Sequence, residues 1–329
     1  MSAALVSSPA PPVLPALFAP TPGASKRFWE FFTTQISNDN TRKAYFNAVR
    51  NFSAWCQSRK IGELGQIEPM HIAAYLKVLE KQELSAPTIK QHLAALRMLF
   101  DWLVVGQVLP VNPAHAVRGP KHSVRKGKTP VLAAEEARAL LDSIIPKDKD
   151  GNETPRLIDL RDRALIGLMV YTFARINAVL SMRVEDYFVQ GRRGWVQLHE
   201  KGGKPHSLPC HHNLDAYLEA YISAAGIAGD AKGTLFRTAE TRTGDELTTK
   251  PMWQQDAYRM IQRRAEKAGI KTRIGNHSFR ATGITAYLKN GGRLEIAQQM
   301  ANHESSRTTG LYDRRGDEIT LDEVERVGI

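Results

Sequence analysis

Apolar residues recur at every third or fourth position from Lys26 onward, which is the period of a helix that buries one face. Residues 41–55 show this period best, with Tyr45, Val49, Phe52 and Trp55. Pro69 marks the start of another helix, and residues 85–105 open with serine and proline, which favour a helix N-terminus. The pattern predicts an all-helical first domain over residues 26–117.

Proline and glycine interrupt the helical period after residue 112, which predicts a linker over residues 118–130. Five cations lie in this linker: Arg118, Lys121, Arg125, Lys126 and Lys128. A basic linker between two domains can wrap around a DNA duplex. The alternative is a solvated hinge that takes no part in binding.

In the second domain, over residues 131–312, apolar residues follow the period of a strand in one segment and the period of a helix in others. Residues 195–209, WVQLHEKGGKPHSLP, alternate between apolar and polar side chains and turn at two glycines, which predicts a β-hairpin. Helical spacing predicts helices over residues 133–143, 158–172, 251–268, 278–290 and 293–300. The expected fold class is therefore mainly α with a small β-sheet, in which a helical N-terminal domain precedes a C-terminal domain that carries the hairpin.

The two ends of the chain differ in composition from these domains. Residues 1–25 hold six prolines and no lysine or arginine, so we expect a mobile tail and no signal peptide. Residues 313–329 hold three arginines against six acidic side chains, and Thr320 with Glu323 predicts a short capped helix. No stretch reaches the roughly 18 uninterrupted apolar residues of a membrane span.

The net charge of +11 is unevenly distributed along the chain. Since residues 313–329 carry −3, residues 1–312 carry +14. This charge favours a polyanion such as DNA or RNA as partner, because each cation that neutralises a phosphate releases counterions. The two cysteines, Cys56 and Cys210, exclude a disulfide framework or a four-cysteine zinc site and favour a reducing, intracellular setting.

The first domain also carries polar, mostly cationic side chains opposite its apolar stripes. They are Arg42, Lys43, Arg50, Lys90, His92 and Arg97. With so basic a chain, their position favours contacts with DNA phosphates over the alternative, a face that is merely solvated.

Candidate chemistry gathers in the second domain. Arg175 follows an apolar helix, where an arginine must find an anion or reach solvent. Lys201 stands immediately before the turn of the hairpin. His277 and Arg280 lie three residues apart at the start of a helix, where a cation and an imidazole form an anion site. Taken singly, these residues would be a surface arginine, a turn lysine and the neighbours of a helix cap.

His303 and Tyr312 complete the candidate set. A tyrosine hydroxyl ordinarily has a pKa of about 10 and is a poor nucleophile unless cations surround it or a base takes its proton. Two arginines, a lysine and two histidines around one phenol suit attack on a phosphodiester, in which negative charge spreads over the non-bridging oxygens. Alone, Tyr312 would be interpreted as one more buried aromatic residue.

With these residues the chain resembles a tyrosine recombinase of the phage-integrase family, the group that includes lambda integrase, Cre and the Xer proteins. The family's catalytic set is Arg, Lys, His-x-x-Arg, His or Trp, and Tyr, and the matching positions are Arg175, Lys201, His277, Arg280, His303 and Tyr312. The resemblance extends from about residue 26 to the end of the chain. The family's first box usually has a glycine and a glutamate where Phe173 and Ala178 stand here.

The resemblance implies a core-binding domain with a SAM-like fold, a catalytic domain of the DNA breaking-rejoining type and the activity of a site-specific DNA recombinase. Tyr312 would attack the scissile phosphate to give a 3′-phosphotyrosyl bond, and Arg175 and Arg280 would bind its non-bridging oxygens. Lys201 would protonate the leaving 5′-oxygen. His277 would help to deprotonate the tyrosine, and the later histidine of the set would hydrogen-bond the phosphate. No metal, ATP or other cofactor is expected.

The resemblance also implies the partners: double-stranded DNA at a specific site and a homotetramer on two paired sites, with residues 313–329 docking on a neighbouring protomer. An accessory DNA-bending protein is a further candidate. The expected location is the cytoplasm, at the nucleoid of a prokaryote or borne by a phage or plasmid. Two other classes remain open: a type IB topoisomerase, and an architectural DNA-binding protein with a disused active site. A zinc site at residues 209–212, PCHH, lacks the four ligands it would need.

Overall fold

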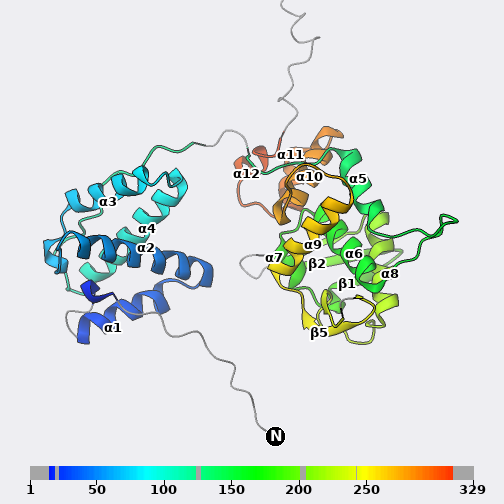
Figure 1. The fold of residues 1–329 in the computed structure, drawn as a ribbon, viewed down its shortest axis with the longest axis horizontal. Helices are drawn as coiled ribbons and strands as arrows, with labels where there is room; N and C mark the ends of the chain where they lie inside the picture. The colour runs from blue at the N-terminus through cyan, green and yellow to red at the C-terminus, as the bar shows by residue number, and fades with distance from the viewer. Residues whose placement is uncertain (1–14, 19–21, 124–126, 201–204, 242, 314–329) are drawn as a thin grey trace, which may run out of the picture. The chain divides into compact units, whose positions relative to one another are not determined.

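The computed structural model describes residues 15–18, 22–123, 127–200, 205–241 and 243–313. The chain forms two compact units, Met1–Ser123 and Val124–Ile329, and the division between them falls inside the linker expected over residues 118–130. Figure 1 shows both units with their elements labelled. Of the helices in the described ranges, none is long and apolar enough to cross a membrane.

The N-terminal unit is built of helices throughout its described part (Figure 1). The side chains of Asn38 and Ser85 accept hydrogen bonds from backbone N–H groups in the first turns of two of these helices, and Pro69 opens a third. Ser85 and Pro69 confirm the start signals in the sequence, and Asn38 is a further cap that the pattern did not predict. The elements are η1 (Ala16–Phe18), α1 (Pro22–Glu30), the π-helical turn η2 (Phe31–Gln35), α2 (Asp39–Ser58), η3 (Leu64–Gln66), α3 (Pro69–Lys81) and α4 (Ala86–Val105).

The N-terminal unit begins earlier than the sequence predicted. Residues 15–25 were expected to belong to a mobile tail, but Leu17 and Phe18 are buried and helix α1 already begins at Pro22. The ring of Phe18 packs on that of Phe28 with centroids 5.3 Å apart. Two apolar side chains therefore hold this segment on the core in spite of its prolines, which the first turn of a helix tolerates. The rest of the expected tail, residues 1–14 and 19–21, lies outside the described residues.

The C-terminal unit is mainly helical with two small antiparallel sheets, which confirms the predicted fold class (Figure 1). Strands β1 (Tyr187–Gln190), β2 (Arg193–His199) and β3 (Pro205–Pro209) form one sheet in the order β1-β2-β3, and β4 (Arg237–Ala239) pairs with β5 (Leu247–Pro251). The helices are α5 (Ala134–Ser143), α6 (Leu157–Thr172), α7 (Ile176–Leu180), α8 (His212–Ala225), α9 (Gln254–Lys267), α10 (Asn276–Lys289), α11 (Leu294–Met300) and α12 (Ser306–Gly310), with the 3-10 turn η4 (Val184–Asp186).

The predicted hairpin is formed by β2 and β3, whose register places Val196 opposite Leu208. Its turn, with Gly202 and Gly203, lies outside the described residues. The helix expected over residues 251–268 begins later, at Gln254, because Pro251 ends strand β5 instead. The pattern of the sequence does not indicate β1, β4, β5, α7, α8 or α12, most of which are five residues or shorter.

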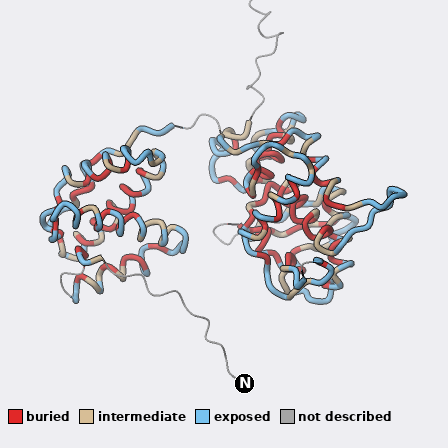
Figure 2. The backbone as a smooth tube through the Cα atoms, in the orientation of Figure 1, coloured by how far each residue is buried: buried red, intermediate tan, exposed pale blue. Residues whose placement is uncertain are grey.

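Helix α6 forms the centre of the C-terminal unit. Its neighbouring residues Leu165, Ile166 and Leu168 are all completely buried, so the helix is covered on every side. Helices α8 and α10 pack against it (Figure 1), and Figure 2 shows the buried positions concentrated in the middle of the unit. The active-site arginine expected after this helix therefore stands at the edge of a rigid core.

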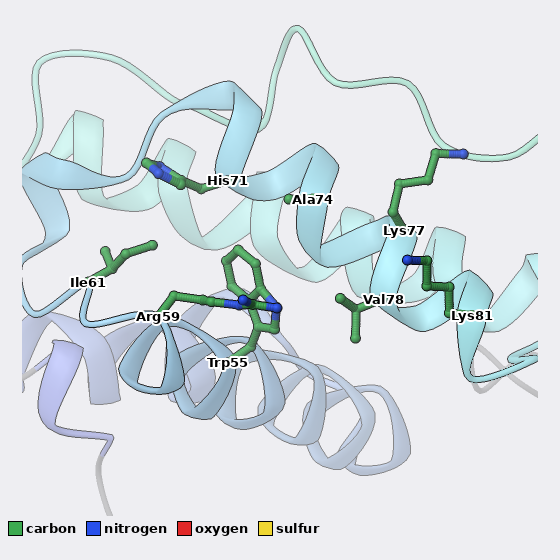
Figure 3. Close-up of a pocket in the computed structure, with 8 residues that line it drawn as sticks. All are labelled: Trp55, Arg59, Ile61, His71, Ala74, Lys77, Val78 and Lys81. Carbon is green, nitrogen blue, oxygen red and sulfur yellow. The ribbon is translucent and has the colours of Figure 1, made fainter.

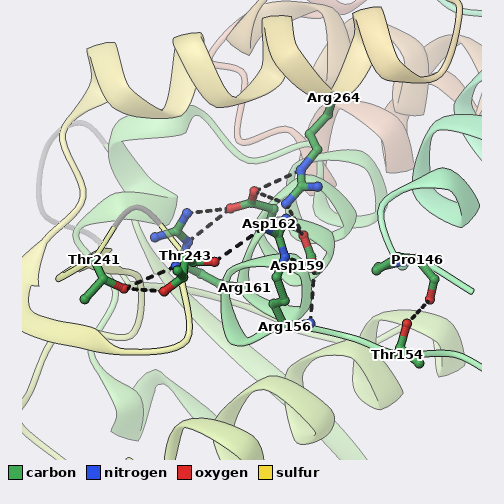
Figure 4. A network of polar contacts seen from close by, with 10 residues as sticks. Pro146, Thr154, Arg156, Asp159, Arg161, Asp162, Thr241, Thr243 and Arg264 are labelled. Atoms are coloured by element: carbon green, nitrogen blue, oxygen red, sulfur yellow. Dashed lines mark hydrogen bonds and ion pairs between the residues drawn. The ribbon is translucent and has the colours of Figure 1, made fainter.

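A buried network of charges joins α6 to α9 (Figure 4). Asp162 lies 2.7 Å from Arg161 and 2.6 Å from Arg264, and Arg264 also lies 2.7 Å from Asp159. Burial alone would raise the pKa of Asp159, but hydrogen bonds from Arg156 and Arg264 outweigh it and the pKa is lowered. The carboxylate of Asp159 therefore stays charged, and its charge is stabilised by its arginine partners.

Replacing Asp162 with alanine should destabilise the C-terminal unit by about 3–5 kcal/mol, because Arg161 and Arg264 would lose a buried counter-charge. Chemical denaturation followed by circular dichroism measures the effect, which is expected in the transition of this unit alone. Asp256→Ala on α9, whose side chain is 47% exposed, is the matched control and should change stability by less than about 0.5 kcal/mol. Equal shifts for both variants would contradict the importance of the network.

Candidate active site

The two arginines of the candidate set come from different elements of the C-terminal unit. Helix α6 ends at Thr172, and Phe173 takes a left-handed conformation, with φ of 58°, that turns the chain away from the helix axis. Arg175 follows as the N-terminal cap residue of α7. Arg280 lies in the second turn of α10, which packs against α6. The turn at Phe173 and the packing of α10 therefore bring the two arginines together.

A buried carboxylate stands between these arginines. Glu200 directly follows strand β2, and its Oε2 lies 2.5 Å from Nη1 of Arg175. Its Oε1 lies 4.0 Å from Nη1 of Arg280. The side chains of Glu200 and Arg280 are each 3% exposed, whereas that of Arg175 is 36% exposed. Glu200 was not among the residues predicted from the sequence, because an acidic residue at the end of a strand carries no recognisable signal.

Arg280 is held by backbone carbonyls as well. Its guanidinium donates to the carbonyl of Phe173 and, over 2.5 Å, to the carbonyl of Ala301. The first carbonyl follows α6 and the second follows α11, so this one side chain joins three helices. Burial, and next the charge of Arg175, lower the pKa of Arg280 to about 10, against the opposite influence of Glu200 and Tyr312. The group remains a cation at neutral pH.

His303 and Tyr312 lie together at the C-terminal end of the described chain. Their rings are stacked almost parallel, at 5°, with centroids 6.0 Å apart. Nδ1 of His303 is 2.8 Å from Oγ1 of the buried Thr309, and Thr285 on α10 donates a hydrogen bond of 3.0 Å to the backbone carbonyl of Tyr312. The short helix α12 lies between the two rings in sequence and returns the chain from one to the other.

Burial, followed by the charges of Arg280 and Arg175, lowers the pKa of His303 to about 3. We therefore expect that its imidazole stays neutral between about pH 5 and 8 in the DNA-free protein. NMR of the ten histidine side chains across this range measures it, and the spectrum of His303→Ala assigns the signal. A midpoint of titration within the range would show that the arginines do not act on His303 as the structure indicates.

His277 is the second residue of α10 and is exposed. Loss of water on its protein side lowers its pKa, and the charges of Arg280 and Arg175 lower it further. The N-terminal cap of the helix is Gly275, whose N–H donates to Oγ of Ser278 over 3.0 Å, so capping is done by other residues. His277 is left free to meet a ligand within the field of both arginines.

The remaining member of the set, Lys201, lies outside the described residues, as does Lys204. The structure does describe the residues that flank the two lysines, since Glu200 precedes Lys201 and strand β3 begins at Pro205. His206 on β3 lies 3.1 Å from the carbonyl of Met300, so the base of the hairpin touches the end of α11. A role for Lys201 stays a prediction.

Three of the residues expected to face DNA in the N-terminal unit have hydrogen-bond partners within the unit. Arg42 donates to the carbonyls of Phe32 and Ile36 and pairs with Asp39 at 2.6 Å, so it holds α2 to the preceding turn. Arg97 donates to carbonyls of the segment after α4, at Ala114 and Val117. His92 is buried beside the hydroxyl of Tyr75, and burial lowers its pKa. These hydrogen bonds give all three side chains a structural role, and their contact with DNA stays a prediction.

The other cations chosen from the sequence are accessible where they are described. Exposed residues are Lys43, Arg50, Lys90, Arg118, Lys121 and Lys128, while Arg125 and Lys126 lie outside the described residues. Their contact with DNA stays a prediction.

A pocket between the end of α2 and α3 adds cations that the sequence analysis did not choose (Figure 3). It has a volume of about 580 Å³, and the guanidinium of Arg59 lies over the ring of Trp55, 5.9 Å from its centroid. Lys77 and Lys81 on α3 line the same pocket. Three cations around a half-buried indole suit a nucleic acid, whose phosphates and bases these groups recognise.

Known families match both units. The model of the phage integrase family matches residues 130–318, and that of the phage integrase N-terminal SAM-like domain matches residues 26–108. The tyrosine recombinase XerD of Mycobacterium tuberculosis is 29% identical over 285 residues, which are 83% of this chain and 86% of the relative. A tyrosine recombinase of Pseudothermotoga lettingae is 25% identical over 297 residues, 88% of this chain and 92% of the relative.

Solved structures share the fold. The XerH site-specific recombinase bound to a palindromic difH substrate superposes with a TM-score of 0.65 at 20% identity, over 87% of this chain and 78% of that one. A lambda integrase dimer bound to a COC′ core site gives 0.63 at 19% identity, over 90% and 77%. Since the first family model spans more than half of the sequence, the chain belongs to the phage integrase family and is a tyrosine recombinase of that family.

Proposed function

We propose that this protein cuts and rejoins DNA strands at a specific site through a 3′-phosphotyrosyl bond to Tyr312. The observation that carries the proposal is the convergence of Arg175, Arg280, His303 and Tyr312 from four separate segments of the C-terminal unit. Two guanidinium groups beside a phenol provide the fixed positive charge that a phosphodiester transition state needs. The charges of these arginines also contribute to the lowered pKa of His277 and of His303.

In the cleavage step the phenolic oxygen of Tyr312 bonds to phosphorus and the 5′-oxygen of the next nucleotide leaves. His277 accepts the phenolic proton, and Lys201 donates a proton to the leaving oxygen. Arg175 and Arg280 bind the non-bridging oxygens. The step is reversed when a 5′-hydroxyl of the partner strand attacks the phosphotyrosyl bond. Because that bond retains the energy of the phosphodiester, ATP is not required, and the guanidinium groups take the role that a metal ion has elsewhere.

His303 is proposed to hydrogen-bond the phosphate in its neutral form. With Nδ1 accepting from the hydroxyl of Thr309, Nε2 carries the hydrogen and can donate to a non-bridging oxygen. The lowered pKa of His303 supports this assignment, because a neutral ring has a fixed donor and a fixed acceptor. Thr309 then sets the orientation of the ring.

The proposed partner is double-stranded DNA, engaged by a homotetramer on two paired sites. XerH was solved on its difH substrate, and a lambda integrase tetramer was solved on a Holliday junction. The site is proposed to belong to a mobile element, a plasmid or a chromosome, with an accessory DNA-bending protein as an additional partner. Residues 313–329, of which 314–329 lie outside the described part of the chain, are proposed to contact a neighbouring protomer.

Capture of the covalent intermediate tests the proposal without knowledge of the target. The protein is incubated with a pool of random duplexes, in the presence of a chelator and without ATP, and the mixture is run on a denaturing gel. DNA that stays attached to protein is released by protease and sequenced. A recurring sequence with one fixed attachment point supports site-specific cleavage, and the absence of any attached DNA would refute the proposal.

The same experiment separates the two alternatives. An architectural DNA-binding protein would retain duplexes on a native gel but leave none attached after denaturation. A type IB topoisomerase would attach to DNA without joining two duplexes, and it would relax supercoils as a monomer. Recombinant products from paired copies of the selected site distinguish strand exchange from relaxation.

A further inference from the structure

One buried carboxylate contacts both arginines of the site. Glu200 lies 2.5 Å from Arg175 through one oxygen and 4.0 Å from Arg280 through the other. Among the described residues these are the only ion pairs that either arginine forms. Ala178, three residues after Arg175 on α7, is 3% exposed and offers no carboxylate. The counter-charge of the site is therefore supplied from the sheet and not from α7.

Glu200 and Arg280 are buried, whereas Arg175 reaches solvent. The side chains of Glu200 and Arg280 are 3% exposed, so water screens their charges little, whereas that of Arg175 is 36% exposed. A guanidinium has five N–H donors, and one nitrogen of Arg175 is committed to Glu200. The remaining donors of Arg175 are aligned by that bond and stay available to a ligand from solvent.

An anion between Arg175 and Arg280 reduces the repulsion between their two positive charges. Two guanidinium groups repel each other in a medium of low dielectric constant, and the charge of Arg175 is one of the causes that lower the pKa of Arg280. Glu200 acts in the opposite direction on the same group. Without the carboxylate, Arg175 would turn toward water before DNA arrives, and the anion site would have to be assembled at each encounter.

We propose that Glu200 is a positioning residue for cleavage: its carboxylate fixes Arg175 and balances Arg280, so that both arginines are in place for the scissile phosphate. It touches neither DNA nor the reacting atoms. Because Glu200 directly precedes Lys201, a competing interpretation is that it orients the proton donor. The two interpretations differ in which step fails when the carboxylate is removed.

The inference rests on the proposed function, and the experiment uses the full chain with a nicked suicide duplex built from the sequence that the wild-type protein captures. Glu200→Gln keeps the shape of the side chain and removes its charge. At saturating protein, its single-turnover rate of covalent attachment should fall by about 10- to 100-fold, while the dissociation constant for the duplex, measured by fluorescence anisotropy, stays within about twofold. Glu200→Asp retains the charge and should lose less.

A duplex with a bridging 5′-sulfur at the scissile phosphate identifies the step that is affected. A thiolate leaves without a proton donor, so this substrate should restore Lys201→Ala but leave the defect of Glu200→Gln in place. If sulfur restores Glu200→Gln as well, Glu200 acts through proton donation and the positioning of the arginines is refuted. An unchanged rate for Glu200→Gln on the ordinary duplex would refute any role in cleavage.

Controls separate these outcomes from misfolding and from failure of the proposed function. Glu185→Gln removes another paired glutamate, 2.9 Å from Lys232, and should cleave at the wild-type rate. Loss of this buried charge is expected to lower the thermal stability of Glu200→Gln, so rates are compared at a temperature where both proteins are folded. If no such temperature exists, the comparison of Glu200→Asp with the wild type decides. If the wild-type protein forms no covalent complex with DNA, both the proposed function and the role of Glu200 are refuted. If the wild type and the Glu200 variants all form the complex at the same rate, only the role of Glu200 is refuted.

Discussion

Tyr312→Phe is expected to abolish the covalent protein–DNA complex while the affinity for the duplex stays within about twofold of the wild type. The substitution removes the phenolic oxygen that is proposed to bond to phosphorus. The hydroxyl makes no hydrogen bond to any described residue, so its loss leaves no protein donor or acceptor unsatisfied. The measurement is a denaturing gel after incubation with the captured duplex, together with fluorescence anisotropy.

The fold of this variant should be unaffected. Tyr312 is positioned by its ring, which stacks on His303, and by its backbone carbonyl, which accepts from Thr285, and phenylalanine preserves both contacts. The matched control is Tyr258→Phe, which removes an exposed hydroxyl from α9 and should form the covalent complex normally. A covalent band that survives in Tyr312→Phe would show that another residue is the nucleophile.

The sequence predicted those elements in which the period is long and the caps are explicit. Helix α4 illustrates this, because twenty residues follow one serine cap and one proline in the first turn. Helix α8 was missed although it is fourteen residues long, since His211 caps it in place of the usual serine or aspartate. The short strands and the five-residue helices α7 and α12 form through tertiary packing and leave too few residues to show a period.

In the candidate site, too, the sequence indicates residues by type and order but not the contacts that tertiary packing creates. Arg175, His277, Arg280, His303 and Tyr312 were chosen by residue type and order, and the structure brings them into one field of charge. The sequence could not reveal Glu200, because an ion pair between residues 25 positions apart depends on how β2 meets α7. Nor could it reveal the carbonyl partners of Arg42 and Arg97, because a helical wheel shows which face is polar and not which carbonyl lies across from it.

The side chains of the candidate site form a cluster that is organised before any DNA is bound and whose parts depend on one another. Arg280 has the most connections, since it contacts the carbonyls of Phe173 and Ala301 and lies near Glu200. Backbone carbonyls orient it, so its position does not depend on bound DNA. An arginine can satisfy these acceptors and a phosphate at the same time because its donors lie in a rigid plane. Lysine has the same charge but lacks that geometry.

Arg280→Lys should therefore lower the single-turnover rate of covalent attachment by about 100- to 1,000-fold, the loss that follows removal of an electrostatic contact made in the transition state. It should also destabilise the C-terminal unit by about 1–3 kcal/mol, because the carbonyls of Phe173 and Ala301 would be left with one shorter donor. Rate and stability are measured on the same preparation, by suicide-duplex cleavage and chemical denaturation. Arg259→Lys, with a side chain 69% exposed, is the control and should change neither. A stable Arg280→Lys variant that cleaves at the wild-type rate would mean that the positive charge suffices and that the planar, carbonyl-anchored guanidinium is not what orients the phosphate.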